Sequence, residues 1–143
     1  MSGTNTPDPS LGGSKAAAIS NMTVRLLSQY TGRGPTKART FFNDDVVTVV
    51  LQDTLTKGES TLVANDKREL VMRTRATFQE VMGDELIAAI ETITGRTVTA
   101  FLSANHIDPD FAVETFILAP REQVGADLAN GRRSVGSAAP GGD

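Results

Sequence analysis

A basic, glycine-rich loop is the first part of the chain whose residue types could do chemistry: Gly32-Arg33-Gly34-Pro35-Thr36-Lys37. Its backbone amides and the side chains of Arg33, Lys37 and Arg39 could bind an anion. A nucleotide-binding P-loop needs a preceding strand, the spacing G-x-x-x-x-G-K-[ST] and a following helix. Here the spacing fails and the order of elements is reversed, so nucleotide hydrolysis is not expected. The alternative to anion binding is that the loop only ends a helix and forms a tight turn.

The single histidine, His106, is the second candidate, because Asp108 and Asp110 follow it closely. Imidazole and carboxylate groups are common metal ligands. Two aspartates around Pro109 are also ordinary turn chemistry. A closed zinc site needs a fourth ligand, usually Cys or His, and the chain has neither to spare. We therefore favour a turn and expect neither a metal ion nor another cofactor.

Catalytic motifs are missing from the sequence. There is no G-x-S-x-G elbow that would place a nucleophilic serine beside the histidine. The acidic pairs Asp44/Asp45 and Asp84/Glu85 are explained by a turn and a helix start, so they give no specific support to a glycosidase. We predict that the protein is not an enzyme.

Arg73 and Arg75 are two residues apart on an expected helix, so they do not share a face. Arg73 is four residues after Glu69, and Arg75 could pair less favourably with Gln79 or Glu80. We expect solvated pairs of small energetic value.

Composition limits the function classes further. The 143 residues include no cysteine, which excludes disulfides, thiolate metal sites and a cysteine nucleophile. The net charge of −3 gives no overall basic signature, so no nucleic-acid partner is expected. Charge is nevertheless uneven, because no acid lies between Asp8 and Asp44 while five basic residues do. This segment is either a solvated basic face or a docking surface for an acidic partner, an anion or an anionic lipid.

No stretch approaches the roughly 18 apolar residues of a membrane span. The N-terminal MSGTNTPDPSLGGSK has no apolar run typical of a signal peptide. We therefore expect a cytoplasmic protein that does not insert into a membrane.

Hydrophobic periodicity and turn residues predict the elements that position these groups. A helix is expected over 15–30 and a β-hairpin over 38–42 and 46–51. The capping box Thr56-Lys57-Gly58-Glu59 opens a short helix through about residue 64. A helix over 67–82 should break or bend at Gly83, with a further helical segment after Asp84. A second hairpin is expected over 97–104 and 111–118.

This order, α-β-β-α-α-α-β-β, predicts an α+β fold: a two-layer sandwich of a four-stranded, largely antiparallel sheet with helices on one face. Residues 15–120 form the single expected domain. Residues 1–14 and the Gly/Ala/Ser-rich residues 121–143 are poor in large apolar side chains, so we expect both to be disordered tails.

Several short motifs together resemble a known family. They are Gly32-Arg33-Gly34-Pro35, Asn43-Asp44-Asp45 before an apolar strand, Leu55-Thr56-x-x-Glu59, Arg75-x-x-Phe78, Thr94-Gly95-Arg96-x-Val98 and Phe116-Ile117-Leu118. The combination, which covers roughly Ile19 to Leu118, is similar to the MpsC-like family of small bacterial proteins, formerly a domain of unknown function. The family takes its name from the soluble component of a sodium-translocating, membrane-potential-generating system.

The resemblance implies a cytoplasmic accessory protein that works beside a membrane transporter or pump subunit, in membrane-potential generation and inorganic-carbon uptake. It carries over no catalytic residues. We therefore expect a non-enzymatic accessory or interaction module, with a small-anion sensor or regulator as the alternative. The expected binding residues are Gly32, Arg33, Gly34, Lys37, Arg39, Asp44 and Asp45. The unpaired edges of a four-stranded sheet would also allow a homo-oligomer.

Overall fold

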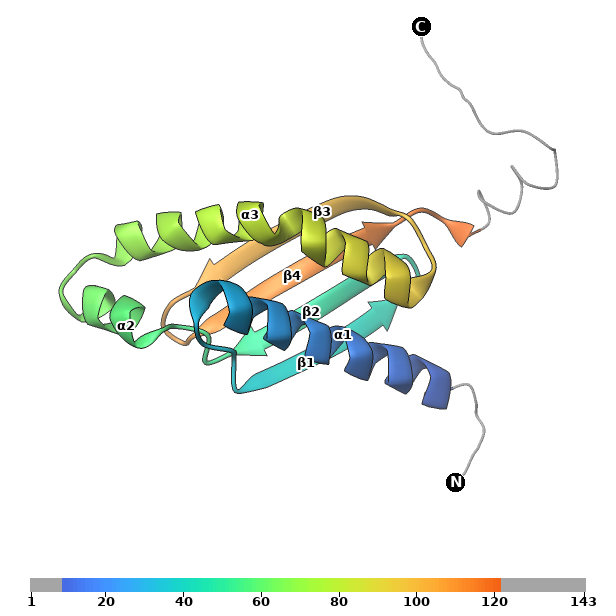
Figure 1. Ribbon diagram of the computed structural model, residues 1–143, viewed down its shortest axis with the longest axis horizontal. Helices are drawn as coiled ribbons and strands as arrows, with labels where there is room; N and C mark the ends of the chain where they lie inside the picture. Colours follow the sequence, from blue (N-terminus) through green and yellow to red (C-terminus); the bar gives the residue numbers. More distant parts are fainter. Residues whose placement is uncertain (1–8, 122–143) are drawn as a thin grey trace, which may run out of the picture.

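The computed structural model describes residues 9–121, and the side chains of residues 13–121. Its elements follow in the order α1 (Pro9–Thr31), β1 (Lys37–Asn43), β2 (Val46–Gln52), α2 (Lys57–Ala64), α3 (Arg68–Thr94), β3 (Val98–His106) and β4 (Phe111–Leu118). Figure 1 shows α1 and α3 lying across one face of the sheet, with α2 beyond its end. The predicted α+β fold is confirmed.

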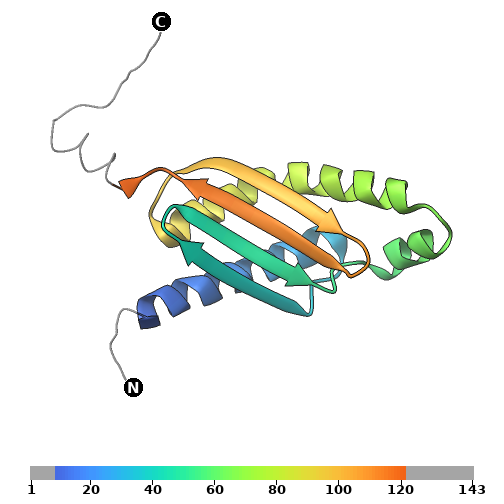
Figure 2. The ribbon, with the colours of Figure 1, turned by 180° about the vertical axis from the view of Figure 1, so that it is seen from behind.

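The four strands form one antiparallel sheet in the order β1-β2-β4-β3. Each hairpin supplies one edge strand and one central strand, so the pairing of β2 with β4 joins the two hairpins. Thr48 lies opposite Thr115 in this pairing, and Val49 lies opposite Glu114. Figure 2 shows the sheet from behind, where none of the helices α1–α3 covers it.

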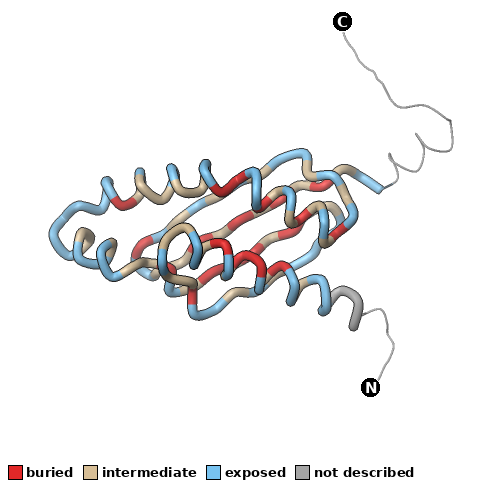
Figure 3. Tube along the Cα trace, in the orientation of Figure 1, coloured by how far each residue is buried: buried red, intermediate tan, exposed pale blue. Residues whose placement is uncertain are grey.

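Strand alternation divides the sheet into a buried and an open face, because successive side chains point to opposite sides. In β2 and β4 the burial alternates strictly along each strand. The helix layer covers the buried set, which Figure 3 shows in the middle of the sheet and on the facing helices. Its largest members are Val47, Val49, Leu51, Phe116 and Leu118 from the sheet, with Ile19, Met82, Leu86 and Ile90 from α1 and α3.

Helix ends follow the predicted local chemistry. Gly32 ends α1 with a left-handed φ of 83°, and its amide donates to the carbonyl of Ser28 at 2.9 Å. At the start of α2 the capping box is confirmed, since the Thr56 side chain and Glu59 each bond the other's backbone amide. Gly95, with φ of 71°, ends α3.

Two predicted boundaries are wrong. Helix α1 begins at Pro9, so residues 9–14 are helical although we placed them in the N-terminal tail. Helix α3 runs without interruption through Gly83, so two central helices replace the expected three. Gly83 is buried, and a Cβ atom there would lie 3.7 Å from the Phe101 ring. This glycine sits where α3 faces β3 and does not end the helix. The predicted tails at residues 1–8 and 122–143 lie outside the described residues.

Candidate functional site

Arg33 of the glycine-rich loop binds other parts of the same chain. Its guanidinium Nη2 lies 2.8 Å from Asp53 Oδ2, and Nη1 donates to the carbonyls of Asp53 and Leu55. The hydrogen bond from Arg33 is the main cause that lowers the pKa of the Asp53 carboxyl. The arginine therefore ties the loop to the segment between β2 and α2.

The loop amides are largely occupied as well. The amide of Gly32 donates to Ser28, that of Arg33 to the Thr31 hydroxyl, and that of Thr36 to the carbonyl of Gln52. A Cβ atom on Gly34 would lie 2.5 Å from Ser28 Oγ, so the loop backbone rests directly on α1. This geometry favours a structural role for the loop backbone over an amide cradle for an anion.

Lys37 and Arg39 remain as exposed cations. They alternate along the edge strand β1 and lie on the sheet face that no helix covers. The Arg39 guanidinium carbon stands 5.5 Å from the centre of the Phe41 ring, a cation–π contact. Neither cation forms a salt bridge with any residue in the described range 9–121.

The turn residues Asp44 and Asp45 lie at the other end of β1, about 20 Å from Lys37 for a strand of this length. Asp45 Oδ1 accepts from Arg96 Nη2 at 2.6 Å, and Asp44 takes the positive φ of 53° that the turn requires. The structure therefore does not bring the acidic turn and the basic loop into one site.

His106 does not join its neighbouring aspartates. Its Nδ1 contacts the carbonyl oxygen of Pro109 at 2.8 Å. The Asp110 carboxylate instead accepts from the Thr54 hydroxyl at 2.7 Å and from the Leu55 amide at 2.9 Å, which anchors the connection from β2 to α2. Within residues 9–121 no group of three His, Asp or Glu side chains could hold a metal ion.

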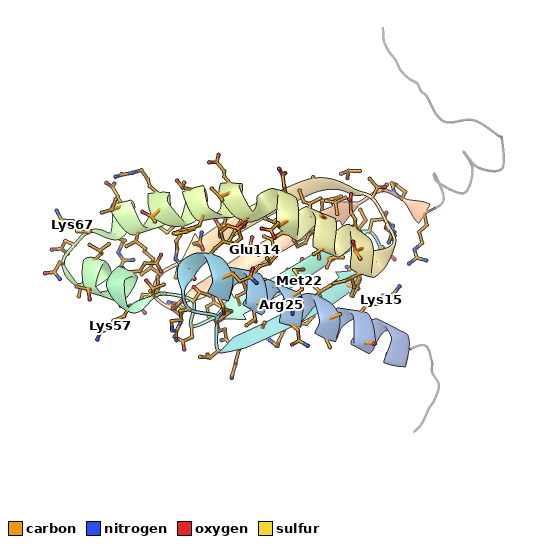
Figure 4. The ribbon with its side chains drawn as sticks, viewed as in Figure 1. Lys15, Met22, Arg25, Lys57, Lys67 and Glu114 are labelled. Atoms are coloured by element: carbon orange, nitrogen blue, oxygen red, sulfur yellow. The ribbon has the colours of Figure 1, made fainter. Side chains whose placement is uncertain are left out.

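A buried carboxyl, which the sequence reasoning missed, lies between α3 and the sheet (Figure 4). Glu114 of β4 is 2% exposed. Ser103 Oγ donates to Oε1 at 2.5 Å, and Gln79 Nε2 donates to Oε2 at 3.2 Å. Burial raises the pKa of Glu114 to about 7, although these two hydrogen bonds and the charge of Arg75 oppose the rise. This carboxyl therefore changes charge near neutral pH.

Arg75 extends the polar cluster toward α2. Its guanidinium donates to Glu59 at 2.9 Å, to the carbonyl of Thr54 at 2.7 Å and to Asn105 at 3.2 Å. Asn105 and Gln79 also exchange hydrogen bonds, so the cluster runs from Glu59 to Glu114. The predicted exposed pairing of Arg75 with Gln79 or Glu80 is wrong, because the side chain is only 11% exposed and points into this cluster.

A small cavity of about 20 Å³ lies beside the cluster, with Arg75, Glu59, Gln79 and Glu114 on its polar side and Leu27, Phe78 and Met82 among its apolar lining. It has room for water but not for an organic ligand. The sequence did carry one signal for the cluster: the alternation of β4 puts Glu114 on the same face as Ala112, Phe116 and Leu118.

The helices of the described chain include none that is long and apolar enough to cross a membrane. Comparison with curated proteins gives no match, and comparison with solved structures gives none either. The family described as "Na+-translocating membrane potential-generating system (MpsC)" matches residues 12–120, about three quarters of the chain. The chain therefore belongs to the MpsC family, as its motifs predicted.

Proposed function

We propose that the protein is a non-enzymatic accessory module of a Na⁺-translocating, membrane-potential-generating system, and that it binds a membrane transporter or pump subunit of that system. The proposed contact is the basic corner, defined as Lys37, Arg39 and Phe41 on β1. One observation supports the proposal: an exposed aromatic ring and two cations that form no salt bridge within residues 9–121 share the uncovered face of an edge strand.

The side chains of the basic corner indicate which kind of partner surface it would bind. Phe41 is 49% exposed, which is high for an aromatic side chain in a strand. Among the strand residues on the same open face there is no carboxylate, so no neighbouring side chain of the sheet neutralises Lys37 and Arg39. An apolar contact flanked by acidic groups on the partner would complement this corner.

The test is affinity purification of the full chain from detergent-solubilised native cells, followed by identification of the proteins that come down with it. We expect the wild type to enrich an integral membrane subunit and Lys37→Glu with Arg39→Glu to lose it. Lys57→Glu with Lys67→Glu is the matched control, because it makes the same charge change at exposed positions around α2 (Figure 4). Circular dichroism and thermal unfolding check that each variant folds. Equal recovery of the membrane subunit by both double variants would place the contact elsewhere.

Anion sensing is the second candidate function. Its support is that Lys37 and Arg39 occupy alternate positions of β1, so both side chains rise from the same face about 7 Å apart. This predicts a thermal shift with bicarbonate or phosphate that exceeds the shift with chloride at equal ionic strength. The shift should vanish in Lys37→Glu with Arg39→Glu. A flat response to all these anions would rule out the sensor.

A further inference from the structure

The face of the sheet that no helix within residues 9–121 covers is unusually apolar for an uncovered surface, with nine apolar residues among its sixteen. It is defined here as the open face and consists of the outward-pointing residues of all four strands (Figure 2). These are Lys37, Arg39, Phe41 and Asn43 of β1, Val46, Thr48, Val50 and Gln52 of β2, Ala100, Leu102, Ala104 and His106 of β3, and Phe111, Val113, Thr115 and Ile117 of β4. An antiparallel sheet with one wet face usually alternates apolar residues inward with polar residues outward.

The two central strands break that pattern most clearly. Their outward side chains include Val46, Val50, Val113 and Ile117 and no charged group at all. Leu102 on β3 adds a side chain that is 57% exposed. Contiguous apolar surface of this kind marks an interaction site in a soluble domain.

The two polar side chains at the centre of the open face contact each other. Thr48 lies directly opposite Thr115, and their hydroxyl oxygens are 3.3 Å apart, within hydrogen-bonding distance. A hydroxyl pair that is bonded internally can leave water at much lower cost than two unpaired hydroxyls. Covering the centre of the open face therefore costs less desolvation free energy than covering two unpaired hydroxyls would.

We propose that the open face binds the open face of a second copy of this chain, giving a two-fold symmetric sheet-on-sheet dimer. Four strands about 4.8 Å apart and seven residues long give a face of roughly 19 by 23 Å, or about 440 Å² before the relief of the side chains is counted. Two such faces bury about 880 Å² before that relief is counted, which is close to the roughly 1,000 Å² at the lower limit for a specific interface. Sheets that pack in this way lie about 10 Å apart and interlock their apolar side chains.

Symmetry also fits a second copy. A two-fold axis parallel to the strands lays β2 of one copy over β4 of the other and β1 over β3. The apolar central strands then form the middle of the contact. Lys37 and Arg39 stay at its rim, where the strand register places them opposite His106 and Ala104 of the second copy's β3, and Phe41 then faces Leu102. An apolar centre with a polar rim is the usual anatomy of a dimer interface.

The test is sedimentation velocity of the full chain over a hundredfold range of protein concentration. We expect the wild type to sediment as a dimer. Val50→Lys with Val113→Lys should sediment as a monomer, with association weakened at least about 100-fold because four lysines would meet in one apolar contact. Val81→Lys is the matched control, since Val81 is 59% exposed on α3 and lies in the helix layer. This variant should remain a dimer.

Each result decides the proposal. A wild-type monomer at every concentration overturns it, whether or not the open face proves to bind another protein or a lipid surface. A dimer that persists in Val50→Lys with Val113→Lys also overturns it, because the contact would then lie elsewhere, for example along β1 or β3 as edge strands. Urea unfolding confirms that the double variant is folded. The basic corner lies at the rim of the same open face, so the dimer and the proposed membrane contact compete for it. The two tests remain distinct, because Lys37→Glu with Arg39→Glu leaves the central strands intact and Val50→Lys with Val113→Lys leaves the basic corner intact.

Discussion

Replacement of Glu114 by Gln should stabilise the protein at alkaline pH and have little effect at acidic pH. Burial raises the pKa of Glu114 from 4.5 to about 7, so the fold disfavours the ionised form. A raised pKa in the folded state gives stability that is fully present below about pH 4.5 and is lost as the pH rises through about 7. The shift of about 2.5 units corresponds to roughly 3 kcal/mol, at about 1.4 kcal/mol per unit.

Glutamine is a close replacement in this cluster. Its carbonyl oxygen can accept from Gln79, and its amide group can donate to Ser103, whose hydroxyl both donates and accepts. The variant thus keeps the neutral form's hydrogen bonds and removes only the titration. We expect the free energies of unfolding of variant and wild type to agree at about pH 4.5 and to differ by roughly 3 kcal/mol at about pH 8.5.

The assay is urea unfolding of both proteins at a series of pH values and one fixed protein concentration. The difference between them cancels the titration of all other groups. Glu80→Gln, at an exposed position on α3, is the control and should show no such pH dependence. A difference that stays flat across the series would refute the reasoning. A variant that becomes less stable than wild type as the pH rises would show that the charge of Arg75 outweighs burial.

Three further substitutions test the packing of the site. Gly83→Ala should raise the free energy of unfolding by about 0.5–1 kcal/mol, because it replaces a mid-helix glycine and the added carbon meets Phe101 at an ordinary 3.7 Å. Thermal unfolding measures this change, and a lower melting temperature would contradict the prediction. Gly34→Ala should lower the free energy of unfolding by about 1–3 kcal/mol, since the added carbon would lie 2.5 Å from Ser28 Oγ. An unchanged melting temperature would show that the loop moves freely. Arg75→Met should lower the free energy of unfolding in urea by about 3–5 kcal/mol, because Glu59 would keep a nearly buried charge without its partner. An unchanged free energy of unfolding would mean that Glu59 is hydrated.

Local signals in the sequence were enough for the fold class. The capping box at Thr56, the glycine that ends α1 and the alternation of β4 each depend on neighbouring residues only. Gly83 was misread because glycine in a helix has two explanations, a break or a close approach. Only the position of Phe101 on β3 distinguishes them.

The polar cluster around Glu114 and Arg75 could not be predicted from the sequence, for a different reason. Its bonds join residues that are far apart in the chain, such as Arg75 with Asn105 and Gln79 with Glu114. These contacts depend on the packing of α3 over β3 and β4, which no local pattern specifies. Arg75 was therefore given local, exposed partners, and Glu59 was recognised only as a helix cap although it also holds Arg75.

Strand β4 shows how far such reasoning can go. Glu114 points to one side of the sheet and its neighbours Val113 and Thr115 point to the other. The alternation in the sequence predicts this division. Which side is buried follows only from the pairing with β2, where Val49 lies opposite Glu114 and Thr48 opposite Thr115. The charged residue then proves to be the covered one and the apolar residue the open one. One strand register therefore accounts both for the burial that raises the pKa of Glu114 and for the apolar Val113 on the open face.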